Sequence, residues 1–325
     1  MSTAFPWILV SGALVTCGVY LLRMRAAGEK ISLALLGIAL AAVIGMDRAK
    51  AGYFLLMLGR DGPDRAVSLA YDKLSIVCGA AGALAGIALS ALLARPGRSP
   101  AKLMDLFAPC GALMLAFCRA AEYCCGTLLG AGKTYLEEGH FLARFPLGIQ
   151  NQWGDWFAAV CTLETALTLG VAAFFFLRKN RRGPGAVWEE TVFALCLNQI
   201  LLESLRNVCM KWGFVRVEQL LCAAAVMGLL VSRCIRSRGV RPFRRWYPAG
   251  VALLCVAGLT GMEFAVDKGL LWLTRQLTGL PARMESPYLP CNTVIAYALM
   301  VLFLAVIAWM EGIALRQSAP AGGRD

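Results

Sequence analysis

Residues 74–94 read LSIVCGAAGALAGIALSALLA and carry no charge. A helix that crosses a bilayer needs roughly 20 predominantly apolar residues, so this stretch is long enough to be a membrane span. Its glycines Gly79, Gly82 and Gly86 recur at helical spacing. Small residues at such spacing line one helix face and allow a second helix to pack closely. We therefore predict a membrane helix whose glycine face lies against a neighbouring helix.

Apolar runs of this kind recur along the whole chain of 325 residues, which is 59% hydrophobic and only 16% charged. Soluble domains are about a quarter charged, so this composition excludes an ordinary soluble protein. We predict an all-α polytopic integral membrane protein with about nine transmembrane helices. The predicted spans are residues 5–22, 31–58, 74–94, 103–125, 156–177, 187–205, 217–231, 247–266 and 293–310.

Basic residues decide the predicted orientation. The net charge is +12, and the odd-numbered connections between spans hold more Lys and Arg than the even-numbered ones. Cytoplasmic loops of membrane proteins collect basic residues. We therefore expect an outside N-terminus and a cytoplasmic C-terminus. The same rule explains the positive charge without a nucleic-acid partner. The first apolar run lacks the flanks of a signal peptide, so we expect it to be retained as a helix.

Cysteine and histidine usage indicates no metal site. The chain has 13 cysteines, most of them inside apolar runs, and one histidine, His140. A cysteine in such a run behaves as a small hydrophobic residue. No spacing typical of a zinc site is present. We predict neither a metal nor another cofactor, and we expect His140 to be solvated in an outer loop.

The outer connections are longer than the cytoplasmic ones. They comprise about residues 126–155 and 267–292. Phe145, Pro146 and Trp153 in the first one predict a segment that lies at the membrane interface. The residues that follow Gln317 are rich in Ala, Gly and Pro, so we predict a disordered tail.

Charged residues inside the predicted spans are the main functional signal. Four basic residues, Arg48, Lys50, Arg119 and Arg206, lie toward the outer ends of their spans in the predicted topology. A charge near the bilayer centre costs about 2.5–3.5 kcal/mol on insertion scales, so such residues usually have partners and face a polar cavity. Acids and amides also lie within the spans: Asp47, Glu122, Glu164, Asn198, Gln199 and Glu203.

Two interpretations of these charges remain open. Glu122 follows Arg119 by three residues, and Arg206 follows Glu203 by three, so each pair can share a helix face. In the first interpretation these are structural ion pairs near the interface. In the second, the arginines form a site for an anionic ligand, because the guanidinium fork matches a phosphate.

The order of motifs resembles that of prolipoprotein diacylglyceryl transferase, a bacterial plasma-membrane enzyme. The resemblance runs from about residue 5 to residue 231 and covers about seven spans. It rests on residues 50–53 (KAGY), 74–79 (LSIVCG), 105–109 (DLFAP), 118–123 (CRAAEY), 203–206 (ESLR) and 217–220 (VEQL). These are similar to the family's Arg-Leu-Gly-Tyr, Leu-Ser-Phe-His-Gly-Gly, Asp-Leu-Leu-Ala-Pro, Gly-Arg-Ile-Gly-Asn-Phe, Glu-Phe-Phe-Arg and a glutamine that opens the last helix.

The resemblance divides the chain into a diacylglyceryl-transferase-like membrane domain (1–235), two additional spans (236–317) and the tail (318–325). It implies that Arg119 and Arg206 match the two arginines linked to the lipid phosphate. It also implies that Lys50, Tyr53, Glu203 and Gln219 bind substrate. The chain departs from the family pattern at Val77, Glu122 and Trp7, where the family has a histidine, an asparagine and a tyrosine.

The implied activity moves diacylglycerol from phosphatidylglycerol to the cysteine thiol of a lipobox peptide in a lipoprotein precursor. The leaving phosphate needs cationic stabilisation, which Arg119 and Arg206 would supply. The thiol needs a base. Because Val77 cannot act as one, we predict Glu122 as the base and His140 as a weaker candidate. A non-catalytic phospholipid-binding protein and a small-anion transporter are the alternatives.

Overall fold

The computed structural model describes residues 4–66, 71–94, 99–125, 128–178, 183–213, 215–237, 239–268 and 291–318. Within these ranges each of the nine predicted spans corresponds to one helix. The helices are α1 (Ala4–Ala26), α2 (Ile31–Ala66), α3 (Ile76–Ala94), α4 (Pro100–Glu122), α5 (Val160–Leu177), α6 (Ala186–Leu205), α7 (Val217–Arg236), α8 (Pro242–Lys268) and α10 (Cys291–Ser318). The all-α membrane class predicted from composition is therefore confirmed.

Eight of these helices are long and apolar enough to cross a bilayer. The remaining one, α6, carries Glu189, Glu190 and Glu203. It nevertheless packs against α4, α5 and α7 inside the bundle, so its acids face protein neighbours and not lipid alone. The helix predicted from residue 156 begins later, because residues 156–159 form a β-strand and α5 starts at Val160.

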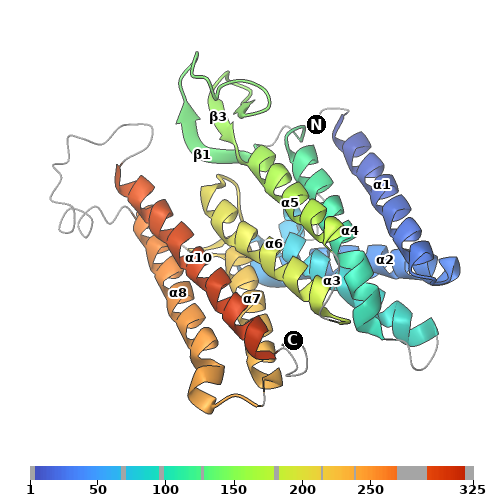
Figure 1. The fold of residues 1–325 in the computed structure, drawn as a ribbon. Helices are drawn as coiled ribbons and strands as arrows, with labels where there is room; N and C mark the ends of the chain where they lie inside the picture. Colours follow the sequence, from blue (N-terminus) through green and yellow to red (C-terminus); the bar gives the residue numbers. More distant parts are fainter. Residues whose placement is uncertain are drawn as a thin grey trace.

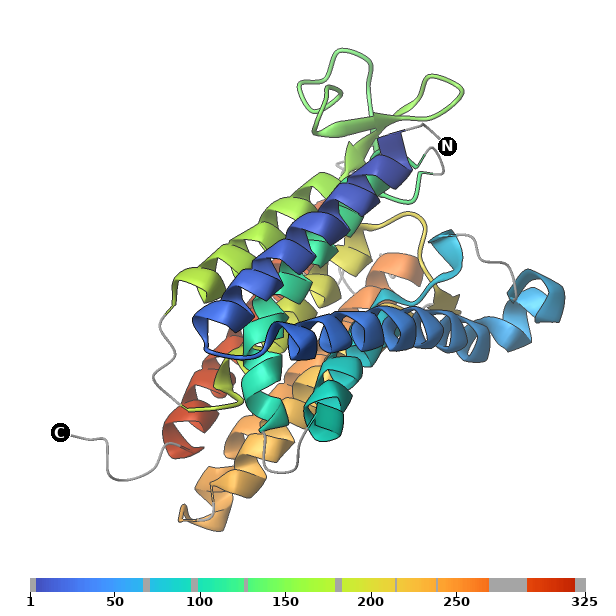
Figure 2. The same ribbon diagram turned by 90° about the vertical axis from the view of Figure 1, so that its right-hand side faces the viewer.

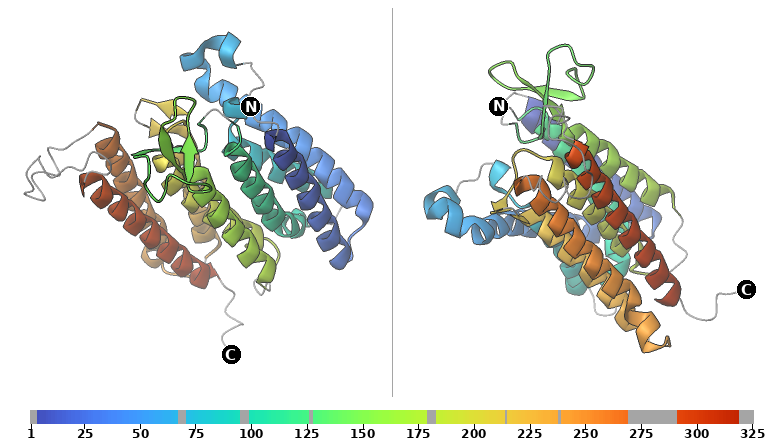
Figure 3. Two further views of the ribbon diagram at one scale, coloured as in Figure 1. Left: turned by 90° about the horizontal axis from the view of Figure 1, so that it is seen from above. Right: turned by 90° about the vertical axis from the view of Figure 1, so that its left-hand side faces the viewer.

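The helices form one elongated array with its strands at one end (Figure 1). Seen from above, α8 and α10 lie at one side of the array and α1 and α2 at the other, with α4, α5 and α6 between them (Figure 3, left). Helix α2 crosses α1 at a large angle (Figure 2). The N-terminal end of α1 lies at the same end of the array as the strands (Figure 1).

The glycine face of α3 packs closely against another helix, as its spacing predicted, and the structure identifies that helix as α2. A Cβ atom on Gly82 would lie 2.7 Å from the carbonyl oxygen of Ile44, and one on Gly86 would lie 2.7 Å from the backbone nitrogen of Ala41. These neighbours are backbone atoms of α2, which side-chain rotation cannot move. Glycine is therefore required for the close approach of the two helices.

The two C-terminal helices share a hydrophobic core with the rest of the bundle. The largest cluster of buried apolar side chains joins Ile200 of α6, Val226 of α7, Leu259 of α8 and Met300 of α10. A second cluster joins the four helices α1, α2, α3 and α4 around Tyr20, Ile87 and further buried apolar side chains. Helices α8 and α10 are thus integrated with the neighbouring helices by burial.

A small β-sheet occupies the long connection between α4 and α5. It consists of β1 (Ala131–Leu136), β2 (Gly148–Gln150) and β3 (Trp156–Ala159), antiparallel in the order β1-β3-β2. The aromatic residues of this connection predicted a segment that lies at the membrane interface; the strands were not predicted. The side chains of Phe145 and Trp153 do project outward from this region and are mostly exposed. A second, two-stranded sheet pairs β4 (Lys211–Trp212) with β5 (Val215–Arg216).

Two predictions fall largely outside the described residues. The predicted outer connection at 267–292 overlaps the described chain only at its two ends, and residues 319–325 of the predicted tail are not described. Ser318, the first residue of that tail, still belongs to α10.

Candidate functional site

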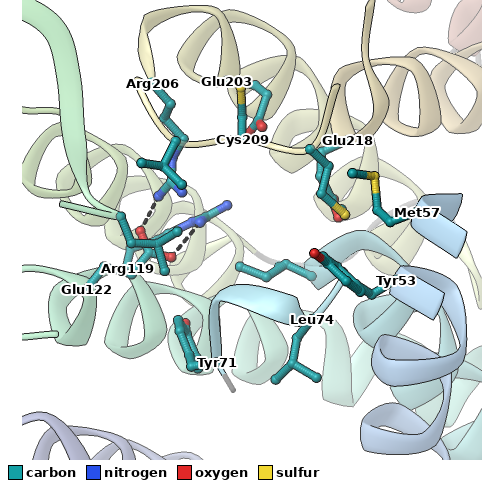
Figure 4. Close-up of a pocket in the computed structure, with 14 residues that line it drawn as sticks. Tyr53, Met57, Tyr71, Leu74, Arg119, Glu122, Glu203, Arg206, Cys209 and Glu218 are labelled. Atoms are coloured by element: carbon teal, nitrogen blue, oxygen red, sulfur yellow. Dashed lines mark hydrogen bonds and ion pairs between the residues drawn. The ribbon is translucent and has the colours of Figure 1, made fainter. Parts of the chain in front are cut away.

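A polar cavity of about 200 Å³ opens at the strand end of the bundle. Figure 4 shows Arg119, Arg206 and Glu122 on one side of it, opposite Tyr53 and Glu218. The other lining residues are Met57, Tyr71, Leu74, Ile76, Leu129, Glu203, Val208, Cys209 and Met210. Polar groups from α2, α4, α6 and α7 thus meet at one place within an otherwise apolar bundle.

Two arginines and two glutamates form a buried cluster beside this cavity. The Nη1 atom of Arg119 lies 2.7 Å from Glu122, and its Nε atom lies 3.4 Å from Glu164. The Nε atom of Arg206 donates to Glu164 at 2.9 Å. Its Nη2 atom also contacts both Glu122 and Glu164. All four residues are almost fully buried. Each arginine therefore has two carboxylate partners, and the four charges sum to zero.

Three helix ends bring this cluster together. Arg119 and Glu122 lie on the last turn of α4, and Glu164 lies early in α5. Arg206 caps the C-terminus of α6 in extended backbone geometry. The β1 strand holds this extended segment, because Gly132 forms a bridge with Arg206 and the backbone nitrogen of Asn207 donates to Ala131 at 3.0 Å.

The extended geometry at Arg206 changes one predicted pair. The spacing of Glu203 and Arg206 suggested one helix face, but α6 ends at Leu205, so helical spacing no longer applies at Arg206. Arg206 instead pairs with Glu122 and Glu164. The predicted pair of Arg119 and Glu122 is confirmed at 2.7 Å.

An amide links the cluster to a further acid. The Nη2 atom of Arg119 donates to the Gln199 side-chain oxygen at 2.8 Å. The amide nitrogen of Gln199 in turn donates to Glu203 at 2.6 Å. Gln199 therefore uses both ends of its amide to join the arginine cluster to Glu203, which lines the cavity. Among the described residues, no cation pairs with the Glu203 carboxylate.

The residue opposite the arginines is Glu218, in the first turn of α7. Its carboxylate accepts hydrogen bonds from the Ser75 hydroxyl at 2.7 Å and from the Val77 backbone nitrogen at 3.1 Å. Both donors lie at the start of α3, where unpaired backbone N–H groups favour an anion. Glu218 thus places a carboxylate beside Val77, the position at which the resembled family carries its histidine.

The predicted site residues divide into two groups. Arg119, Arg206, Glu122, Glu203 and Tyr53 line the cavity together. The other two predicted residues do not line it: Lys50 lies with its ammonium 5.6 Å from the Tyr53 ring centroid, and the Gln219 amide donates to the carbonyl oxygen of Ile200 at 3.0 Å.

Three further residues that the sequence singled out also lie elsewhere. The Arg48 side chain is 64% exposed and pairs with Asp47 at 3.2 Å. His140 is exposed, and its Nδ1 atom accepts a hydrogen bond from the backbone nitrogen of Leu142 at 3.2 Å. Trp7 is exposed on α1. None of these lines the cavity.

Four residues that the fold brings to the site were not among the predicted site residues. Glu164 stood out only as an acid within a span, and Glu218 adjoins the selected Gln219. Tyr71 and Cys209 line the cavity from connecting segments. Burial raises the pKa of both the Tyr71 hydroxyl and the Cys209 thiol, so both side chains are neutral hydrogen-bonding groups at neutral pH.

No family model, curated protein or solved structure matches this chain. The resemblance to the diacylglyceryl transferases therefore rests on the quoted motifs alone.

Proposed function

We propose that the protein binds the phosphate of phosphatidylglycerol in this cavity and transfers the diacylglyceryl group to the cysteine thiol of a lipoprotein precursor. The observation that carries the proposal is the convergence of Arg119 and Arg206 on one polar cavity inside a membrane bundle. They come from different helices and match the two phosphate-linked arginines of the resembled family.

In the binding step, the lipid phosphate replaces the Glu122 carboxylate as a partner of the two arginines. Glu122 lines the cavity, whereas Glu164 is not among its lining residues and contacts the arginines from behind. An entering phosphate therefore displaces Glu122 and accepts from the freed guanidinium groups, whose planar forks suit it. Glu164 remains in place, so the arginines never lose all their counter-charge in the buried site.

The transfer step forms a carbon–sulfur bond and breaks a carbon–oxygen bond. The thiol sulfur attacks the carbon of the diacylglyceryl group that bears the phosphate ester. Glycerol phosphate leaves with the bonding electron pair, and the two arginines stabilise its charge. The thiol proton passes to a carboxylate. Glu203 is better placed for this than Glu122, because Glu122 already neutralises two arginines while Glu203 accepts from the neutral Gln199 amide.

We further propose that the strand end of the bundle is the outer side of a bacterial plasma membrane. The opposite ends of α1 and α7 carry Arg23, Arg25, Arg233 and Arg236 in their last turns. The positive-inside rule places such ends at the cytoplasm. The cavity then lies at the depth of the outer headgroups, where phosphatidylglycerol and an exported precursor can both reach it.

The test is a lipidation assay with the purified full chain, phosphatidylglycerol vesicles and a lipobox peptide, followed by mass spectrometry of the peptide. We expect a diacylglyceryl mass gain that is lost in Arg206→Ala and Glu203→Gln. Arg48→Ala removes an exposed arginine and is the matched control, which should retain turnover. Full activity in Arg206→Ala would contradict the proposal.

A non-catalytic phospholipid-binding protein is the second candidate. Two observations favour it: Val77 stands at the histidine position, and both arginines are already paired with carboxylates. Retained phosphatidylglycerol binding without any transfer, with binding lost in Arg206→Ala, would support this candidate over the enzyme.

A further inference from the structure

A second cavity, of about 180 Å³, lies between α6, α7 and α8. Its rim carries the exposed side chains of Leu220 on α7 and Thr260 on α8. Both helices are long and apolar enough to span a membrane, so the rim faces the lipid. The remaining lining residues are Ile200, Val215, Arg216, Gln219, Ala223, Val256, Leu259 and Glu263. The cavity is thus mostly apolar, with charged groups at one end.

Arg216 supplies an unused hydrogen-bond donor to this cavity. Its side chain is 0% exposed. The Nε atom donates to Glu263 at 2.6 Å, and the Nη1 atom donates to the carbonyl oxygens of Arg206, at 3.1 Å, and Glu203. The Nη2 atom is buried and has no hydrogen-bond partner among the described residues. A buried donor without a partner costs about 1–3 kcal/mol, more for a charged group. An acceptor in the cavity would remove this cost.

The charge around Arg216 is also unbalanced. Glu263 is the shared acid: it pairs with Arg216, lies 3.9 Å from the ammonium of Lys133 and accepts from the Ser204 hydroxyl. Arg216, Lys133 and Glu263 together carry one excess positive charge. Burial and the nearby Arg216 guanidinium lower the pKa of Lys133. The surroundings therefore favour an additional negative charge.

We propose that this second cavity binds the carboxylate end of a single-chain lipid, such as a fatty acid, that enters from the bilayer. The carboxylate accepts from Nη2 of Arg216 and balances the excess charge. The cavity volume equals that of roughly six water molecules, enough for a carboxylate and the first few methylene groups. The rest of the chain follows the lipid-facing side of α7 and α8, past Leu220.

This lipid site is separate from the cavity of the proposed function. Arg216 stands between them, because it lines the second cavity while its Nη1 atom donates to the carbonyl oxygens of Glu203 and Arg206, two residues that line the first. Helix α8, which lines only the second cavity, has no counterpart in the resembled family. The lipid site therefore does not depend on diacylglyceryl transfer.

The test is photo-crosslinking of the purified full chain in nanodiscs with palmitic acid that carries a diazirine on its chain. We expect mapped adducts on α7 and α8 near Leu220 and Val256, and competition by palmitic acid but not by its uncharged methyl ester. Arg216→Gln should reduce the adducts at least tenfold. Arg216 also holds Glu263 and two backbone carbonyl groups, so its substitution changes contacts within the protein. A second variant that keeps Arg216 is therefore needed.

Ala223→Leu fills the cavity without changing any charge, since Ala223 lines it and is buried. Ala224→Leu makes the same change at the neighbouring exposed position and is the matched control. We expect at least a tenfold loss of adducts in the first variant and no loss in the second. Equal labelling of both variants, or equal competition by the methyl ester, would overturn the proposal. The proposal would also be overturned if phosphatidylglycerol displaced the photoprobe and palmitic acid did not.

Discussion

Glu164 is the structural counter-ion of the arginine cluster, and its loss gives the sharpest prediction. Glu164 lies 2.9 Å from the Nε atom of Arg206 and 3.4 Å from that of Arg119, and it is 1% exposed. Glu164→Gln keeps the side-chain shape but leaves the cluster with one uncompensated buried charge. Removing one partner of a buried ion pair costs about 3–5 kcal/mol. We expect a loss of that size in the free energy of unfolding.

The native cysteines provide the assay. Several of them, including Cys110 and Cys161, are fully buried free thiols. A maleimide dye that fluoresces on reaction reports unfolding as the purified protein is heated in detergent. On the scale of soluble domains, the predicted loss lowers the apparent Tm by roughly 6–20 °C. The exposed pair of Asp47 and Arg48 provides the control: Asp47→Asn should cost about 0–1 kcal/mol.

A double-mutant cycle separates lost charge balance from lost packing. Arg119→Gln combined with Glu164→Gln restores neutrality in the cluster. The double variant should therefore lose less stability than the sum of the single variants, with a coupling of about 0.5–3 kcal/mol. If Glu164→Gln is as mild as Asp47→Asn, or if the two single losses simply add, the counter-ion explanation is refuted.

Three further predictions follow from individual contacts. Glu122→Asn removes the carboxylate that a lipid phosphate must displace, so phosphatidylglycerol should bind at least tenfold more tightly in a vesicle-binding titration; weaker binding would contradict the exchange. Gly86→Ala should cost about 1–3 kcal/mol in the dye assay, because its Cβ meets α2 backbone, whereas Gly170→Ala, with no atom within 4 Å, should cost nothing. Asp105→Ala should cost about 1–2 kcal/mol, because Asp105 accepts from the backbone nitrogens of Gly185 at 2.7 Å and Trp188 at 2.8 Å at the start of α6; an unchanged Tm would refute this.

Sequence spacing predicted one ion pair of the site correctly and failed for a second pair. Arg119 and Glu122 are three residues apart on one helix, so their pairing follows from helical geometry. Glu203 and Arg206 have the same spacing, but the helix ends between them, and the contacts of Arg206 pass to Glu122 and Glu164 instead. The end of α6 at the site depends on β1, which pairs with the chain at Arg206. Residue spacing does not encode this pairing.

On α7, the residue that lines the cavity is one position away from the predicted one. Gln219 was the expected site residue, yet Glu218 is the one that lines the cavity. Successive residues on a helix are about 100° apart, so a one-residue difference decides which cavity a side chain reaches. The rotation of α7 is set by its packing against α6 and α8, and a single sequence does not reveal that rotation.

The sequence by itself determined the class, the order of the helices and the close packing of the glycine face of α3 against another helix. Each apolar run must satisfy its own backbone hydrogen bonds in lipid, so run length alone predicts a helix. Only the tertiary structure decided which charges meet. Arg206 and Glu164 are 42 residues apart, and Glu218 and Ser75 are 143 apart. Such partners are chosen by how whole helices pack, because a buried charge is tolerated only where the fold brings a counter-charge to it.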